Sequence, residues 1–207
     1  MLRPMRHLAR DRRGIAAVEF AMVAPVLFLL LLGFLDVVYL GRGHLRVQTT
    51  AMQVGQIISQ CTSIASGSDD AALKALARRT LGAFADAGRP WAVVVTAIGL
   101  NALNQPSELW RIDNRMDPGK PVADPQFTPV GPTVPAGMTL RADQVMYRTE
   151  VFAVVDTTLF TRANSLLAPL VNSRPITERV DSTVLHIARS PDASRLRTNT
   201  SAEACLS

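Results

Sequence analysis

The residues near the start of the chain that could do chemistry are Gly14, Ile15 and Glu19. Glu19 is the only charged residue from Ile15 to Leu35, a stretch that is otherwise apolar. A carboxylate near a bilayer core costs about 2.5–3.5 kcal/mol on insertion scales, so we expect it to have a function. If the chain is cut after Gly14, Ile15 gains an α-ammonium one helical turn from Glu19. The spacing therefore predicts an ion pair with this ammonium, in the same subunit or a neighbouring one.

A basic leader and a long apolar segment must position these residues. Residues 1–14 contain five arginines and one aspartate, a net charge of +4. Residues 15–40, with the apolar run that ends at Leu35, are long enough to cross a hydrocarbon core about 30 Å thick as a transmembrane helix. The positive-inside rule places the N-terminus in the cytoplasm and the residues from 41 onward outside.

Simpler interpretations of this segment are also available. A secretory signal peptide fits poorly, because the apolar segment is long and no small-x-small cleavage site follows it. A plain signal anchor fits better but leaves Glu19 unexplained, and Gly14 would then be a flexible joint. Pro25 removes one backbone hydrogen bond, which either lets the helix bend on packing or is merely tolerated. We expect Asp36 to be an interfacial acid at the outer headgroup level.

The N-terminal pattern resembles the TadE-like family of minor pilins (pseudopilins) of the tight-adherence (Flp) pilus systems. The resemblance is carried by Gly14, the Val18-Glu19-Phe20 triplet, Pro25, Asp36 and the Gln48-Thr49-Thr50-Ala51 continuation, over about residues 10 to 55. It implies cleavage by a prepilin peptidase between Gly14 and Ile15, and a role in assembly for Glu19, Phe20 and Pro25.

The resemblance also implies partners and a location. The partners would be the membrane, the prepilin peptidase, other pilin subunits and the proteins of the pilus assembly platform. The chain would be a single-pass protein of the bacterial inner membrane with a periplasmic C-terminal domain, and would reach an extracellular pilus if it enters the fibre. The alternative is an uncleaved, membrane-anchored binding module that meets a secretion or envelope partner.

Helical periodicity continues beyond the predicted span. Four apolar residues fall on one helix face, namely Val47, Ala51, Val54 and Ile58. We therefore predict one helix from about 15 to 60, with Gly41 and Gly43 as a hinge outside the bilayer. A second helix is predicted over 71–88, with Gly88 as its end.

The remaining chain predicts strands, a loop and a tail. Strands are expected at 91–100, 108–115, 144–157 and 177–190, a proline-rich surface loop at 116–137 and a short helix at 158–171. The strand at 144–157 alternates in a way typical of half-burial. The fold class is then α+β: a long N-terminal helix packed on a small antiparallel sheet with an additional helix, as in pilins. Residues 41–190 would form this domain, and residues 191–207 a disordered tail.

Residue types argue against catalysis. The three histidines lie at no metal-ligand spacing, and no nucleophile-elbow or phosphate-binding glycine motif occurs. We therefore expect no enzyme, no cofactor and no metal. Nucleic-acid binding is not expected either, because the charge of +5 lies mainly in the leader. Cys61 and Cys205 could form a disulfide in an oxidising compartment or remain two independent thiols.

Overall fold

A computed structural model describes residues 12–61, 64, 68–86, 90–113, 129–156, 177–188 and 205. They divide between Leu40 and Gly41 into two compact units. The first contains the N-terminal part of a long helix. The second, called the head below, contains the described residues from Gly41 to Val155 and from Thr177 onward. The predicted leader, up to residue 11, and the predicted helix at 158–171 lie outside the described residues.

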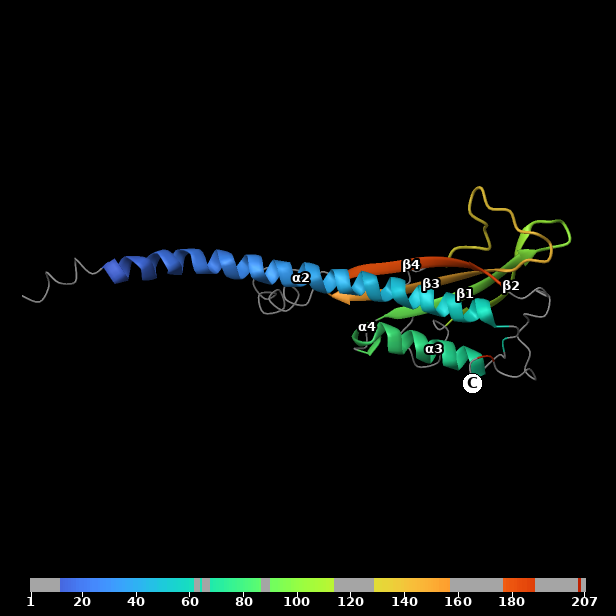
Figure 1. Ribbon diagram of the computed structural model, residues 1–207, viewed down its shortest axis with the longest axis horizontal. Coiled ribbons are helices and arrows are strands. Elements are labelled where there is room, and N and C mark those ends of the chain that lie inside the picture. The colour runs from blue at the N-terminus through green and yellow to red at the C-terminus, as the bar shows by residue number, and fades with distance from the viewer. Residues whose placement is uncertain are drawn as a thin grey trace, which may run out of the picture. The chain divides into compact units, whose positions relative to one another are not determined.

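The long helix α2 runs from Arg12 to Gln60 without interruption (Figure 1). It continues through Pro25 and through both glycines that were expected to form a hinge. The prediction of one helix from about 15 to 60 is therefore confirmed. The hinge at Gly41 and Gly43 stays a prediction, and the boundary between the two compact units falls beside Gly41. Apolar residues that pack at helical spacing hold the C-terminal end of α2 in the head.

Two shorter helices follow, α3 from Ser68 to Leu81 and α4 from Ala83 to Asp86. The break between them falls at Gly82, whose φ is +57°, inside the helix predicted over 71–88. The predicted end at Gly88 lies outside the described residues. The Gly82 N–H donates to the carbonyl of Arg78 at 2.9 Å, which closes the last turn of α3. A left-handed residue at this point is the usual way in which a glycine ends a helix.

The head contains one four-stranded sheet in the order β2-β1-β3-β4. The strands are β1 (Trp91–Leu100), β2 (Pro106–Asp113), β3 (Met146–Asp156) and β4 (Thr177–Ile187). β1 pairs antiparallel with both β2 and β3, and its register with β2 shifts between Ala97 and Ile98. The α+β class and the four predicted strands are thus confirmed.

Within the head, α2 and α3 lie on the same face of the sheet (Figure 1). Val47, Ala51, Val54 and Ile58 of α2 are each 0% exposed, as their spacing predicted. Two glycines let α2 approach the strands closely. A Cβ on Gly43 would lie 2.7 Å from Cγ2 of Val155, and one on Gly55 would lie 2.4 Å from Nδ1 of His186. Gly43 therefore has a packing role, because any larger residue would collide with Val155.

Strand β3 is buried on both of its faces, and the prediction that it is half-buried is wrong. Its even-numbered side chains lie away from the helices, yet Arg148 is 4% exposed, Glu150 3% and Phe152 0%. Phe152 packs with Ala92 and Val94 of β1. Part of the loop before β3 covers this second face, and its contacts are described below.

Candidate membrane and assembly surface

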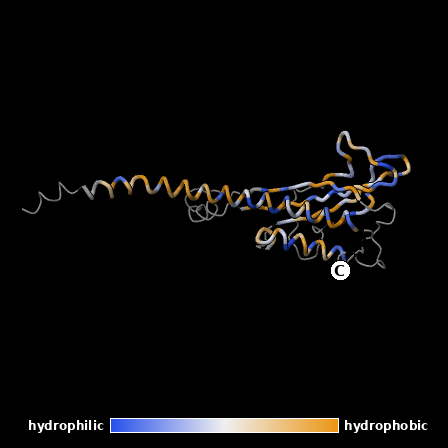
Figure 2. Tube along the Cα trace, viewed as in Figure 1, coloured by the Kyte–Doolittle hydropathy of each residue, from blue (hydrophilic) through white to orange (hydrophobic). Residues whose placement is uncertain are grey.

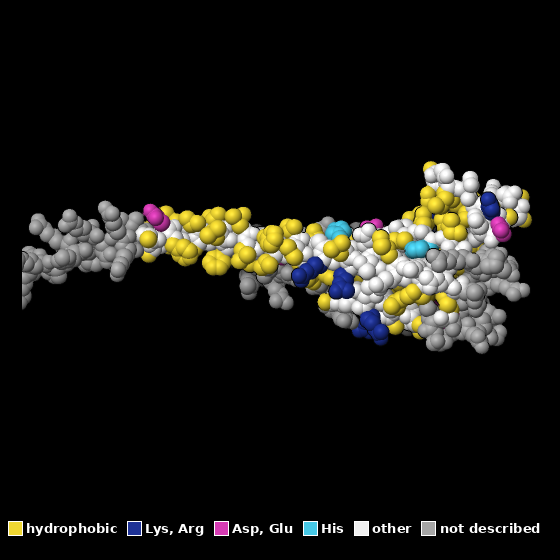
Figure 3. Space-filling model, in the orientation of Figure 1, with side chains coloured by type: hydrophobic (Ala, Val, Ile, Leu, Met, Phe, Trp, Pro, Cys, Tyr) yellow, Lys and Arg dark blue, Asp and Glu magenta, His cyan; other side chains and the backbone are white. Residues whose placement is uncertain are grey.

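The first part of α2 exposes apolar side chains in every direction. Six consecutive residues, Val26 to Leu31, are each between 52% and 66% exposed. Six successive positions go around a helix more than once, so no side of it is covered. Leaving so many large apolar side chains in water would cost on the order of 10 kcal/mol. Figure 2 shows the hydrophobic residues along the N-terminal part of α2, and Figure 3 shows the hydrophobic surface that they form on the face in view.

This surface fits a lipid environment by length and composition. One helix has a window apolar enough to span a membrane, with a mean hydropathy of 2.5, of which 6% is buried within the protein. Residues 16–40 of that helix are about 38 Å long at 1.5 Å per residue, which exceeds the thickness of a hydrocarbon core. The finding is consistent with a single membrane anchor near the N-terminus.

The predicted assembly residues lie on this exposed helix. Glu19 is exposed, Phe20 is 67% exposed and Pro25 is exposed. Gly14 and Ile15 belong to the first turns of α2, so a chain that begins at Ile15 would begin within the helix. Asp36 is 6% exposed and is therefore shielded within the protein, whereas its position at the headgroup level stays a prediction. Glu19 is thus the acid that the apolar surface leaves accessible to a partner.

At the other end of α2, a disulfide ties the C-terminus to the head. Cys61 follows the last helical residue and is 2% exposed, and its partner is Cys205, 144 residues further on, with Cα atoms 5.7 Å apart. The backbone N–H of Cys205 donates to Oδ2 of Asp69, at 3.1 Å. Asp69 lies in the first turn of α3 and is 0% exposed. Three distant segments of the chain therefore meet at one point.

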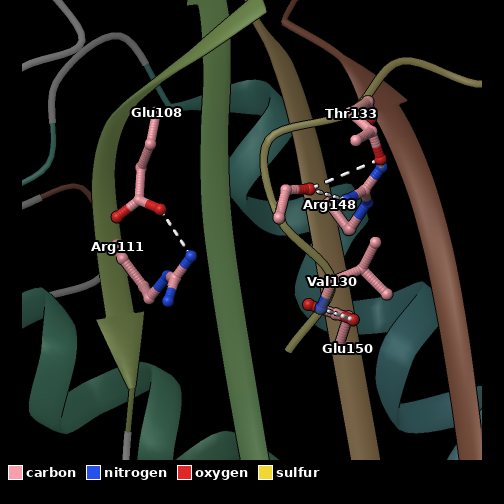
Figure 4. A network of polar contacts seen from close by, with 7 residues as sticks. Glu108, Arg111, Val130, Thr133, Arg148 and Glu150 are labelled. Atoms are coloured by element: carbon pink, nitrogen blue, oxygen red, sulfur yellow. Dashed lines mark hydrogen bonds and ion pairs between the residues drawn. The ribbon is translucent and has the colours of Figure 1, made fainter. Parts of the chain in front are cut away.

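The end of the proline-rich loop is fastened to β3 by two buried charged residues (Figure 4). The guanidinium of Arg148 donates to the carbonyls of Gly131 and Thr133. Oε1 of Glu150 accepts the backbone N–H of Val130, at 3.1 Å. Charge-assisted bonds of this kind compensate for the removal of both groups from water. Residues 130–133 therefore act as a cover for the sheet.

Beyond that cover, the loop forms one wall of an apolar groove. The groove has a volume of about 340 Å³ and lies between the turn after β1 and the segment before β3. Its apolar lining includes Leu100, Pro106, Val134, Met138 and Leu140. In the turn itself, Oδ1 of Asn101 accepts the N–H groups of Leu103 and Gln105, both at 2.9 Å. Leu103 is consequently held outward, with 76% of its surface exposed.

Two aromatic side chains of the sheet, Tyr147 and His186, have altered proton affinities. Burial raises the pKa of Tyr147 far above its usual value, so the phenol stays protonated. Burial also lowers the pKa of His186, whose ring lies against Gly55. Neither shift is accompanied by an acid–base pair in the described residues, and no group of three or more metal-ligating side chains is found among them.

Two features were not predicted from the sequence. One is the pair of charged residues that binds the loop, Arg148 and Glu150, and the other is the packing of Gly43 and Gly55 against the strands. The alternation over 144–157 predicted one buried face only, and it did not indicate that Arg148 and Glu150 would both be buried. Gly43 and Gly55 do share a helix face with the apolar stripe at spacings of four residues, and this signal could have identified them.

The exposed apolar helix and the small α+β head are typical of one general class, namely proteins that an N-terminal helix anchors. Within that class, residues 14–56 match the family model of TadE-like proteins. The match begins at Gly14 and covers Glu19 and nearly all of the rest of α2, so it confirms the resemblance carried by the sequence. It indicates involvement in a tight-adherence pilus system. No curated protein and no solved structure matched the chain.

Proposed function

We propose that the chain is a minor pilin subunit that takes part in assembling a tight-adherence pilus. The observation that carries the proposal is Glu19, an exposed acid on a helix surface that is otherwise apolar. After a prepilin peptidase cuts between Gly14 and Ile15, the Ile15 ammonium of the same or a neighbouring subunit neutralises this carboxylate. In a bundle of apolar helices, such a pair fixes the axial register of the subunits, a specific role that buried ion pairs can have.

In this proposal the helix lies in the bacterial inner membrane and the head lies in the periplasm. Two independent observations support the orientation. The arginines of the leader favour a cytoplasmic N-terminus. The disulfide between Cys61 and Cys205 favours an oxidising compartment for the head, since cytoplasmic thiols are kept reduced. Once in a fibre, the same head would be extracellular.

The proposed subunit acts by assembly and not by catalysis. Its partners would be the peptidase, other pilin subunits and the proteins of the assembly platform. The exposed residues around Glu19 support this role because they provide lipid contacts before assembly and helix contacts afterwards. Phe20 supplies apolar area next to the ion pair, and Pro25 leaves the carbonyl of Ala21 without its helical hydrogen bond, which eases a local bend.

Substitution of Glu19 tests the proposal. In cells that make the pilus, Glu19→Ala should insert into the membrane at the wild-type level but abolish assembly. An ammonium left unpaired in an apolar bundle costs about 3–5 kcal/mol, which corresponds to about a hundredfold or more in association. Pili are counted by electron microscopy and membrane levels by immunoblot. Val23→Ala is the matched control, because Val23 is also exposed on α2 but uncharged, and it should assemble normally.

The alternative, an uncleaved anchored binding module, is favoured by one observation, the apolar groove of the head. The groove would bind a segment of a secretion or envelope partner, and Glu19 would have no role. Normal function of Glu19→Ala, combined with a loss of function in Met138→Asp, would favour this alternative and contradict the pilin proposal.

A further inference from the structure

The disulfide that joins Cys61 to Cys205 connects two thiols in very different surroundings. Cys205 is exposed and lies two residues before the end of the 207-residue sequence. Cys61 is 2% exposed, and its Sγ lies 3.5 Å from the carbonyl oxygen of Ile57. Its neighbours Ile58 and Ile64 are 0% and 1% exposed, so this sulfur lies in the core of the head.

We propose that a thiol–disulfide oxidoreductase of the periplasm makes this bond, with Cys205 as the entry thiol and Cys61 as the resolving thiol. This inference rests on the proposed periplasmic location of the head. A thiolate that attacks a disulfide must reach one of its sulfurs, so access decides which cysteine reacts with a protein-sized oxidant. Cys205 meets that requirement and Cys61 does not.

The reaction then proceeds in two balanced steps. The Cys205 thiolate attacks one sulfur of the oxidant's disulfide, which forms a mixed disulfide and releases the second sulfur of the oxidant as a thiolate. The Cys61 thiolate then attacks Sγ of Cys205, which closes the intramolecular bond and releases the first sulfur. Overall, the two thiols of this chain lose two protons and two electrons, and the disulfide of the oxidant becomes a dithiol.

Asp69 is the positioning residue for the second step. Its buried carboxylate accepts the backbone N–H of Cys205 and thereby holds the end of the chain beside Cys61. The resulting Cα–Cα distance of 5.7 Å lies within the range that a disulfide requires. The bond can close only after residues 62–205 have crossed the membrane, because both cysteines must lie in the same compartment. Oxidation is therefore a step that follows translocation of Cys205.

Single cysteine variants test the assignment. Full-length Cys61→Ser and Cys205→Ser chains are produced in pilus-forming cells, which are quenched in acid and alkylated with N-ethylmaleimide. Non-reducing electrophoresis and mass spectrometry then measure adducts to a protein with a redox-active Cys-x-x-Cys motif. Cys61→Ser, which keeps the entry thiol, should accumulate at least about tenfold more adduct than Cys205→Ser, which keeps only the buried thiol. The double variant should form none.

Both single variants lack the disulfide, so impaired folding alone would not produce a difference between them. Equal adducts, more adduct in Cys205→Ser, or none in either variant would overturn the proposal. The N-terminus, read from the same samples, separates this inference from the proposed function. A chain that begins at Ile15 but forms no adduct contradicts only the inference. A chain that keeps its leader and forms the adduct contradicts only the pilin assignment.

Replacement of Asp69 tests the second step separately, that is, the attack of the Cys61 thiolate on Sγ of Cys205. In a pulse-chase experiment with both cysteines present, Asp69→Ala should prolong the mixed disulfide. Asp69→Asn keeps a carbonyl oxygen as acceptor and should restore closure close to the wild-type rate. An Asp69→Ala chain that closes as fast as the wild type would show that this contact does not position Cys205.

Discussion

The two halves of α2 belong to one continuous helix but follow opposite packing rules. From Ala16 to Leu40 the helix is apolar apart from Glu19 and Asp36, and the side chains from Val26 to Leu31 are all more than half exposed. From Gly41 to Gln60 it has one buried stripe, in which Val47 and Ala51 are 0% exposed, and one polar face. We call these segments the inner half and the outer half.

The difference shows what each half requires in order to be stable. The outer half finds its partners within the chain, and its buried polar groups are satisfied locally. The Thr50 hydroxyl, for example, donates to the carbonyl of Arg46 at 2.8 Å. Most of the inner half lacks such cover, as the side chains from Val26 to Leu31 show, so an apolar environment outside the chain must cover it. The periodicity of apolar residues therefore distinguishes the outer half, which packs on the head, from the inner half, which needs a partner outside the chain.

The largest expected effect concerns the inner half and follows from blocking cleavage. Gly14→Leu should obstruct the approach of the peptidase to the backbone, so that the leader is kept and the Ile15 ammonium never forms. Membrane insertion should remain, but assembly should be lost. Intact-chain mass and pilus counts measure the two outcomes. Gly41→Ala is the control, since a Cβ there has no neighbour within 4 Å. If an uncleaved Gly14→Leu chain still assembled, the claim that assembly through the inner half depends on cleavage would be contradicted.

The next largest effect concerns the disulfide at Cys61, directly after the end of the outer half. Cys205→Ser should lower the free energy of unfolding of the head by about 2–5 kcal/mol, because the disulfide closes a long loop of the unfolded chain. Urea unfolding of the full chain in detergent micelles, followed by the fluorescence of Trp91 and Trp110, measures it. The wild type under reducing conditions should lose a similar amount. A loss below about 1 kcal/mol would show that the bond does not stabilise the head.

A smaller effect comes from the packing of the outer half. Gly55→Ala should destabilise the head by about 1–3 kcal/mol, because the added Cβ overlaps the ring of His186. Gly41→Ala, in the same helix but with open space, should be neutral or stabilise by up to about 1 kcal/mol through helix propensity. Thermal unfolding of both variants in detergent gives the comparison. Equal effects at the two positions would mean that α2 does not pack tightly on the sheet.

The smallest effect is the pH dependence caused by His186. Burial lowers its pKa in the folded state, so the unfolded chain binds the proton more readily. The stability contributed by the neutral ring is complete above about pH 6.5, the ordinary value for histidine, and declines as the pH falls below it. In His186→Gln this part of the decline should disappear. Thermal unfolding at pH 7.5 and pH 5.5 tests it, and identical pH profiles for both chains would contradict the assignment.

Much of this fold could be predicted from local patterns. The helix at 15–60 and the strand at 91–100 are recognisable because apolar residues at helical spacing and a short β-branched run are local signals. The break at Gly82 was not predicted, because Ala83 and Phe84 continue the apolar pattern past it and the sequence does not reveal its φ of +57°.

The errors on β3 and the open question of the cysteines have a different cause. The strand at 144–157 was expected to be half-buried, but backbone groups of Gly131, Thr133 and Val130 bind Arg148 and Glu150 and cover its second face. These partners are backbone groups of a loop that lies 15 to 20 residues away, and no sequence pattern marks them. Cys61 and Cys205 are 144 residues apart, and only the folded head brings them together.

The central claim is that Glu19, in the exposed inner half, gains a positively charged partner only when cleavage creates a new amino terminus at Ile15. Intact-mass measurement of the wild-type chain, extracted from membranes of cells that hold the peptidase, tests this claim most directly. The account predicts a chain that begins at Ile15 and contains one disulfide. A chain of full length, with the arginine-rich leader still attached, would contradict it.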